Sequence, residues 1–249
     1  MRLKLLALAT LTALIVLLNA YRLGAEAELI RSPAAPHGVS SPSAYRVARA
    51  HGQPIAILRR ATALRAAPSH AAARLAELGL RTQFGTPRVL AATRERRGWL
   101  RVLSEQLPNG RTGWIPSSSA IVVASPWSVR ADLSTRTVEV RRDGRVVRRF
   151  PVAIGKPSTP TPTGRFAVTD KLRIRGQSAA YGCCALALSG HQPYIEPGWR
   201  GGDRMAIHGT GDPGSIGTAA SFGCLRAGED DVHWLINHVL LGSLVEIRD

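Results

Sequence analysis

Short apolar runs separated by turn residues recur along this chain, and they constrain its fold more than any other feature. Residues 51–124 hold four such runs, at 54–58, 88–92, 99–103 and 113–115. Residues 125–249 hold six more, at 137–140, 145–150, 166–169, 185–188, 205–207 and 244–247. Runs of this length bounded by Gly, Pro and Asn are typical of β-strands. Asp143-Gly144 stands between two of them and is a strong signal for a two-residue hairpin turn. We therefore expect a mostly β protein.

Helical patterns are few. The stretch 229–240 begins with Glu229, Asp230 and Asp231, whose carboxylates would complement the dipole of a first helical turn. Apolar residues at 232, 235, 236 and 239 then form one face, and Gly242 would end the helix. The alanine-rich stretch 71–80 would form a second, short helix between strands. We expect residues 125–249 to form a β-sandwich or barrel with one helix after Cys224.

The first 50 residues indicate targeting rather than folded structure. Arg2 and Lys4 precede an apolar run at 5–20, which predicts a signal peptide or membrane anchor over residues 1–27. The run is short against the roughly 20 residues of a membrane span. Residues 28–50 are rich in Pro, Ser and Ala and predict a linker. We expect an exported protein of the cell envelope, either cleaved or held at the membrane by this segment.

The net charge of +16 is uneven along the chain. Residues 1–126 carry 17 Lys and Arg against 5 Asp and Glu, whereas residues 127–249 carry 16 against 12. A basic surface concentrates anionic wall polymers or the anionic surface of a membrane, unless these arginines only form solvated faces. No recognisable nucleic-acid-binding module is present, so nucleic acid is not an expected partner.

Cys224 is the candidate nucleophile. The chain has three cysteines, and an odd count in an exported protein leaves at least one free thiol. The imidazole of His208 would take the thiol proton and so activate the sulfur for attack on an acyl carbonyl. Gly223 permits close backbone approach, so the amides of Gly223 and Cys224 would face a developing oxyanion. Arg226 would point to the same side of an extended segment and bind a substrate carboxylate.

The adjacent pair Cys183-Cys184 leaves two interpretations open. A disulfide between neighbouring residues would be strained, whereas two thiols would behave as small buried apolar groups. A zinc site built from this pair with His191 and His208 lacks any ligand pair spaced by two residues, which structural zinc sites usually have. We expect no metal and no other cofactor.

Two stretches of the second half resemble the catalytic signature of the L,D-transpeptidase (YkuD) family. They are IHGTGDPGSIG, which begins at residue 207, and SFGCLR, which begins at residue 221. GKPSTPTPTGRF at 155–166 and LALSGH at 186–191 resemble the same family in the same order, so the likeness covers most of 127–249. RRGWLRVLSEQLPNGRTGWIP at 96–116 resembles the end of a bacterial SH3-like domain. The expected division is therefore a small SH3-like β-barrel at 51–124 and a catalytic domain at 125–249.

This resemblance implies a ping-pong acyl transfer on peptidoglycan stem peptides. Cys224 would form a thioester with a tetrapeptide stem and release D-alanine, and an amine of a second stem would capture the acyl group to give a 3→3 cross-link. His208 would be the base, with its ring oriented by the carbonyl of Gly209. Carbapenem-type β-lactams would acylate the same sulfur. The residues expected to contact substrate are Ser221, Arg226, Thr210, His191 and Phe222.

One position departs from the family pattern, and two other functions stay open. The family usually has His immediately before the Gly-Cys pair, where this chain has Phe222. Phe222 can neither donate nor accept a hydrogen bond, so the polarity of the pocket would differ. An L,D-carboxypeptidase would share the acyl-enzyme step and differ only in the acceptor. A non-catalytic wall-binding protein would use the basic first half alone.

Overall fold

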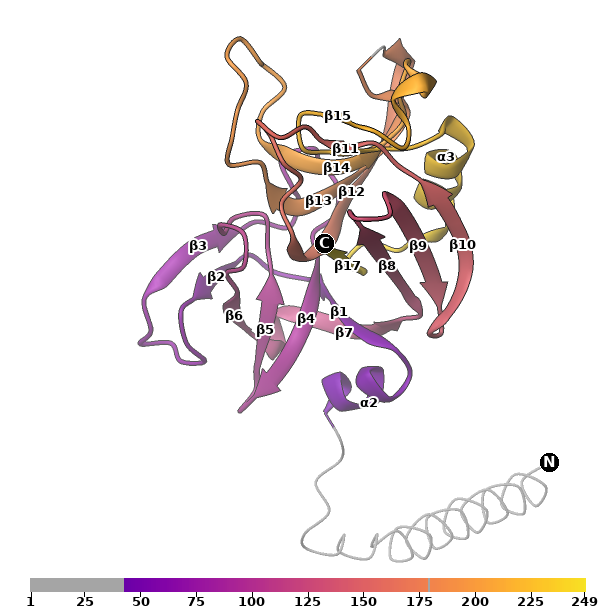
Figure 1. The fold of residues 1–249 in the computed structure, drawn as a ribbon. Coiled ribbons are helices and arrows are strands. Elements are labelled where there is room, and N and C mark those ends of the chain that lie inside the picture. The colour runs from indigo at the N-terminus through magenta and orange to yellow at the C-terminus, as the bar shows by residue number, and fades with distance from the viewer. Residues whose placement is uncertain (1–42, 179) are drawn as a thin grey trace, which may run out of the picture. The chain divides into compact units, whose positions relative to one another are not determined.

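The computed structural model describes residues 43–178 and 180–249. The expected signal or anchor segment at 1–27, and the linker as far as residue 42, lie outside the described residues. None of the described helices is long and apolar enough to cross a membrane. The described chain contains two large β-sheets, one built from residues before Pro126 and one from residues after it (Figure 1).

The first sheet has seven strands in the order β3-β2-β6-β5-β4-β1-β7. Every pairing in it is antiparallel, as expected for short runs joined by tight turns. Its strands are β1 (Gln53–Leu58), β2 (Thr62–Arg65), β3 (Arg74–Leu78), β4 (Val89–Arg96), β5 (Trp99–Leu103), β6 (Gly113–Pro116) and β7 (Ala120–Ser125). Its core is formed by apolar side chains that include Leu64, Leu78, Leu90, Leu100 and Ile115.

Two expectations for this part of the chain were wrong. The alanine-rich stretch forms strand β3 instead of a helix, because pairing with β2 buries Leu78 completely. The end of the expected linker forms helix α2 (Ala44–Ala50). The Ser43 side chain caps α2 by accepting a hydrogen bond from the backbone N–H of Arg46 at 3.3 Å, and α2 packs against β7 and β1.

The second sheet has eight strands in the order β10-β9-β8-β17-β12-β13-β14-β16 and is curled. Its members are β8 (Trp127–Asp132), β9 (Thr137–Arg142), β10 (Arg145–Pro151), β12 (Gly164–Ser178), β13 (Gly182–His191), β14 (Arg204–His208), β16 (Leu225–Arg226) and β17 (Leu244–Arg248). Two short strands, β11 (Ile154–Gly155) and β15 (Ala219–Ser221), pair separately. The mostly β fold predicted from the sequence is confirmed.

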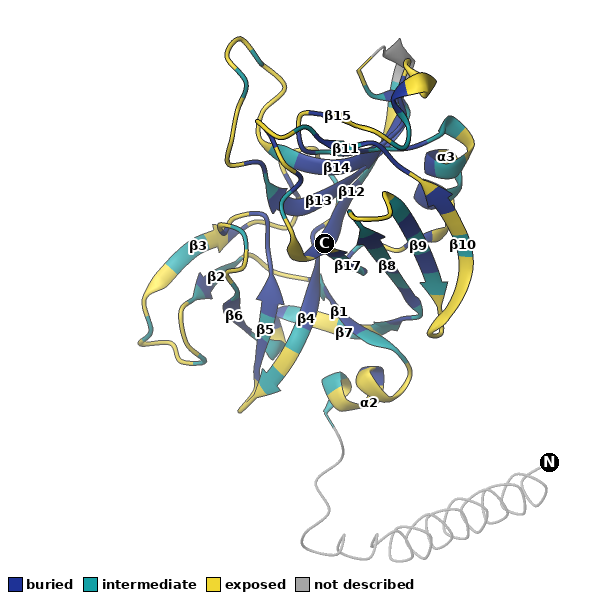
Figure 2. Ribbon diagram, in the orientation of Figure 1, coloured by how far each residue is buried: buried dark blue, intermediate teal, exposed yellow. Residues whose placement is uncertain are grey.

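The hairpin predicted at Asp143-Gly144 joins β9 to β10, and both residues have positive φ, 51° and 78°, as a type I′ turn requires. Helix α3 (Glu229–His238) follows β16 and packs against β13. Its buried face is the predicted one, with Val232, Leu235 and Ile236 in the core. The helix ends two residues earlier than expected. Figure 2 shows that β13 and β14, which lie between β12 and the edge strand β16, are mostly buried.

A buried ion pair lies beside the start of β4 and the end of β5 in the first sheet. Arg88 and Glu105 form this pair with side chains that are 5% and 2% exposed. The Arg88 guanidinium also donates to the carbonyl oxygens of Gly79 and Arg81, each at 2.8 Å. The Glu105 carbonyl in turn contacts the ring of His191 in the second sheet, at 2.9 Å. This pair therefore lies next to a junction between the two sheets.

We expect Glu105→Ala to lower the free energy of unfolding by about 3–5 kcal/mol, because it leaves a buried guanidinium without its counter-ion. Urea denaturation measures this change. The matched control is Glu77→Ala, which removes a carboxylate from an exposed pair with Arg74, where the side chains are 67% and 61% exposed. That variant is expected to lose less than about 1 kcal/mol. Equal losses in the two variants would contradict this assignment.

Candidate active site

The sheet topology brings the predicted nucleophile and base to one place. Strands β14 and β16 pair in parallel, with Ile207 opposite Leu225 and His208 opposite Arg226. The last residue of β14 therefore lies beside the loop that carries Cys224 into β16. The Ala227 N–H donates to the His208 carbonyl at 2.9 Å and extends this pairing by one residue.

One pocket collects most of the predicted site residues. Cys224, His208, Arg226, Ser221 and Phe222 all line it. The lining also includes residues that sequence patterns did not indicate, namely Ala180, Tyr181, Gln192, Tyr194, Ile195, Glu196, Trp199, Gly201, Gly202, Asp203 and Arg204. Most of these come from the segment between β13 and β14, which has no periodic pattern that would place it over the site.

The imidazole of His208 is held in its neutral form. Its side chain is buried at 3% exposure, and Nδ1 lies 2.6 Å from the carbonyl oxygen of Gly209. Because a carbonyl only accepts, Nδ1 carries the proton and Nε2 keeps its lone pair. Burial lowers the pKa of His208 to about 4, the positive charge of Arg226 adds to this effect, and the Gly209 hydrogen bond opposes it. The Tyr181 ring contacts the imidazole edge-on, with centroids 4.9 Å apart.

Cys224 is a neutral thiol in this arrangement. Burial raises its pKa, and this effect outweighs the backbone N–H of Ala206 and the charge of Arg226, which both lower it. The thiol donates to the carbonyl oxygen of Arg204 at a sulfur–oxygen distance of 3.8 Å. Cys224 nevertheless lines the pocket, and the residue is only partly buried. Before any substrate binds, Cys224 is therefore an uncharged thiol and His208 an uncharged imidazole.

Ser221 and Gly223 shape the loop before Cys224. The Ser221 hydroxyl donates to the Cys224 carbonyl at 2.6 Å and accepts from the Gly223 N–H at 3.0 Å. Gly223 has a φ of 111°, and an added Cβ would lie 1.9 Å from Nε2 of Gln192, so this position requires glycine. The expectation that the Gly223 amide faces an oxyanion is corrected, because that N–H already donates to Ser221.

Arg226 and Phe222 both line the pocket, one with a charged side chain and the other with an apolar one. Nε of Arg226 is buried and has no hydrogen-bond partner among the described residues, whereas the residue as a whole is partly buried and lines the pocket. Phe222 is 37% exposed and packs edge-on against Trp199, with centroids 5.4 Å apart. Nζ of Lys156 lies 4.7 Å from the Phe222 ring. An aromatic ring with a lysine ammonium beside it thus occupies the position where the family usually has His.

Two predicted contact residues lie elsewhere. The His191 ring is held between Oδ2 of Asp203 at 2.8 Å and the carbonyl of Glu105 at 2.9 Å, so it joins the two sheets instead of lining the pocket. Thr210 is 6% exposed, and its N–H donates to the carboxylate of Glu229 at 3.0 Å. The expectation that His191 and Thr210 contact substrate is therefore corrected for the described pocket.

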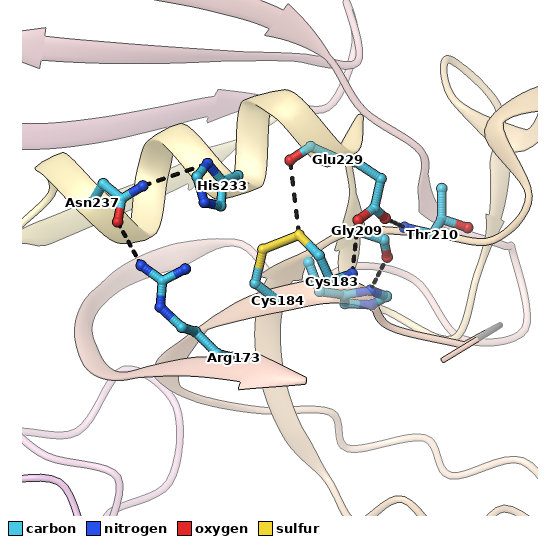
Figure 3. The surroundings of a disulfide bond; sticks show 9 residues. Arg173, Cys183, Cys184, Gly209, Thr210, Glu229, His233 and Asn237 are labelled. Atoms are coloured by element: carbon cyan, nitrogen blue, oxygen red, sulfur yellow. Dashed lines mark hydrogen bonds between the residues drawn. A yellow bond between two sulfur atoms is a disulfide. The ribbon is translucent and has the colours of Figure 1, made fainter. Parts of the chain in front are cut away.

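The adjacent cysteines form a disulfide between Cys183 and Cys184 (Figure 3). Of the two interpretations left open by the sequence, the structure has the vicinal disulfide. Cys224 is consequently the free thiol of the chain. Among residues 43–178 and 180–249, no group of three or more His, Cys, Asp or Glu side chains is arranged to hold a metal ion.

Comparison with known proteins identifies the family. A family model of the YkuD L,D-transpeptidase catalytic domain matches residues 126–247. YqjB of Bacillus subtilis (strain 168) is 30% identical over 118 residues, which are 46% of this chain and 67% of that protein. The chain therefore belongs to the YkuD L,D-transpeptidase family.

A second relative and one solved structure add to the comparison. YkuD of Bacillus subtilis (strain 168) is 34% identical over 123 residues, or 49% of this chain. The match covers 66% of that protein, just under two thirds of its length. The solved structure of LD transpeptidase LdtMt1 in complex with imipenem has a TM-score of 0.41 and 19% identity, and the match covers 84% of this chain and 88% of that one.

Burial raises the pKa of Cys224. We therefore expect the rate at which iodoacetamide alkylates Cys224 in the free protein to increase with pH, with a midpoint above the ordinary thiol pKa of about 8.5. Alkylation rates across a pH series, read by intact-mass spectrometry, measure this. Cys224→Ser is the control for site selectivity. A midpoint below about pH 7.5, in the range of activated cysteines, would contradict the neutral pair.

Proposed function

We propose that this protein is an exported peptidoglycan L,D-transpeptidase that works through a thioester on Cys224. The observation that carries the proposal is that the free thiol and a buried, neutral imidazole line one pocket in a chain of the YkuD family. The donor is a tetrapeptide stem, and the acyl group belongs to its third residue. The proposal covers the acceptor as well, which is a side-chain amine of a second stem.

The acylation step uses His208 twice. On attack, the Cys224 proton moves from sulfur to Nε2 of His208, and a carbon–sulfur bond forms at the third-residue carbonyl. The bond to the terminal D-alanine nitrogen then breaks, and the imidazolium returns its proton to that nitrogen. The proton on Nδ1 stays on its hydrogen bond to Gly209 throughout. A thioester and free D-alanine result.

The second step releases the sulfur. The amine of the acceptor stem attacks the thioester carbonyl and passes its proton to Nε2 of His208. The carbon–sulfur bond breaks, and the thiolate recovers a proton from the imidazolium. The product is an amide that joins two third-position residues, the 3→3 cross-link. Water in place of the amine would give a shortened stem, which is the carboxypeptidase alternative.

Three features support the placement of substrate. The guanidinium of Arg226, a partly buried residue that lines the pocket, would bind a stem carboxylate. The aromatic wall of Phe222 and Trp199 would contact apolar parts of the stem. The N–H of Cys224 itself is the oxyanion donor that we propose, since the Gly223 N–H is engaged by Ser221.

The first sheet and the N-terminal segment would bring the catalytic pocket to the cell-wall polymer. We propose that residues 51–124 are an SH3-like module that positions the catalytic domain on the wall, and that the basic excess of residues 1–126 favours anionic polymers or membrane. Residues 1–27 would direct export and either be removed or anchor the chain. A non-catalytic wall-binding protein would need only these parts and would leave the Cys224 pocket without a role.

We expect Cys224→Ala and His208→Ala each to abolish turnover of a disaccharide-tetrapeptide while the circular dichroism spectrum stays unchanged. Mass analysis of the products separates the candidate functions. A cross-linked dimer with released D-alanine supports transpeptidation, tripeptide alone supports the carboxypeptidase, and unchanged substrate with wild-type protein supports a wall-binding role. Full turnover by either variant would refute the proposed mechanism.

Incubation with a carbapenem is expected to add the mass of one intact inhibitor to the wild-type protein, because opening of the β-lactam ring leaves the acyl group on sulfur. Peptide mapping should place the adduct on Cys224, and Cys224→Ser should show none. An adduct on Cys183 or Cys184, or no adduct on wild-type protein at equimolar inhibitor, would count against Cys224 as the nucleophile.

A further inference from the structure

Glu229 connects three segments behind the site. It is the first residue of α3, and its two carboxylate oxygens accept different backbone N–H groups. Oε1 accepts from Thr210 at 3.0 Å, and Oε2 accepts from Cys183 at 2.7 Å. Figure 3 shows the carboxylate between the turn that holds Gly209 and Thr210 and the start of β13, where the disulfide lies.

The Thr210 N–H and the Gly209 carbonyl are two ends of one planar peptide unit. The carbonyl end accepts the Nδ1 proton of His208 at 2.6 Å, and the N–H end donates to Glu229. The preceding N–H, that of Gly209, donates to the Cys184 carbonyl at 3.1 Å. The peptide that orients the imidazole is therefore held at its N–H end by Glu229, and the peptide before it is held by the Cys184 carbonyl.

Two glycines make room for this carboxylate. A Cβ added to Gly209 would lie 2.3 Å from Oε1 of Glu229, and one added to Gly182 would lie 1.8 Å from the same atom. Real Cβ atoms do not approach an oxygen so closely, so both positions must lack a side chain for the carboxylate to reach the two N–H groups. The backbone is thus shaped around Glu229, and this goes beyond what a first-turn helix carboxylate needs.

We propose that Glu229 is a positioning residue for His208 and acts through the Gly209–Thr210 peptide. A carboxylate that accepts the N–H of a peptide polarises the carbonyl at its other end, which makes that carbonyl a stronger acceptor. The contacts run from the Glu229 carboxylate through the peptide to the imidazole. The negative charge of the carboxylate therefore favours the imidazolium that forms when Cys224 loses its proton. The positive charge of Arg226 acts in the opposite sense, because it disfavours the imidazolium. The inference rests on the proposed acyl transfer.

The test compares Glu229→Gln with the matched control Asp230→Asn. Both remove one negative charge from the first turn of α3, but Asp230 is exposed. Glutamine keeps the shape of glutamate, yet it has only one oxygen and so serves one of the two N–H groups. We expect Glu229→Gln to lower kcat for tetrapeptide turnover by about tenfold, the factor that corresponds to one weakened charged hydrogen bond, with KM within about twofold. Asp230→Asn should match wild type.

A second readout does not depend on turnover. In the wild-type protein, ¹⁵N NMR of His208 should show a single tautomer with the proton on Nδ1, and Glu229→Gln should show a mixture of both tautomers at neutral pH. A purely structural role would lower the melting temperature and leave the tautomer unchanged. A variant with wild-type kcat, or with the wild-type tautomer alone, overturns the inference.

The two hypotheses fail in different ways. Wild-type protein that does not turn over the stem peptide removes the proposed function, and the NMR comparison still decides whether Glu229 orients His208. Active wild-type protein with an unaffected Glu229→Gln variant removes only the role of Glu229.

Discussion

The hydrogen bond from Nδ1 of His208 to the carbonyl of Gly209 is the contact on which the site depends. At 2.6 Å it fixes which ring nitrogen carries the proton and leaves Nε2 as the acceptor at the pocket. Without it, a buried imidazole at 3% exposure would have to find another partner for its N–H or rotate away. A backbone carbonyl takes the orienting place that an Asp or Asn side chain has in other nucleophile–base pairs. How precisely the His208 ring is oriented then depends on how rigidly the backbone of Gly209 is held.

The fold supplies that rigidity from several elements. Parallel pairing of β14 with β16 sets His208 opposite Arg226, and β13 holds the Gly209 N–H through the Cys184 carbonyl. Helix α3 adds its first carboxylate from a third direction. The Arg204 carbonyl receives the thiol of Cys224, while the Arg204 side chain donates to Leu188 and Thr169 within the same sheet. His208 is thus the last residue of β14 and Cys224 directly precedes β16, and the neighbouring Ile207 and Leu225 are fully buried.

The sequence predicted the parts of this site that local patterns encode. Alternating runs, the Asp143-Gly144 turn and the apolar face of α3 follow from local geometry, and family resemblance added Cys224 and His208. The contacts made across the fold were not predictable in the same way. His191 was expected in the groove because of its place in the chain, but the docking of the two sheets places its ring against Glu105 and Asp203. The sequence indicates Glu229 only as a first-turn carboxylate, because its hydrogen-bond partners lie 19 and 46 positions away. The stretch 71–80 was misjudged because burial of Leu78 in a sheet overrides helix propensity.

The central claim is that a neutral imidazole, oriented by a backbone carbonyl, stands ready to receive the proton of a neutral thiol. Neutron diffraction from deuterium-exchanged crystals of the free protein at neutral pH tests it most directly, because it locates each proton. The account predicts deuterium on Nδ1 of His208 and on the sulfur of Cys224, with none on Nε2. Deuterium on both ring nitrogens beside a bare sulfur, or on Nε2 alone, would contradict it.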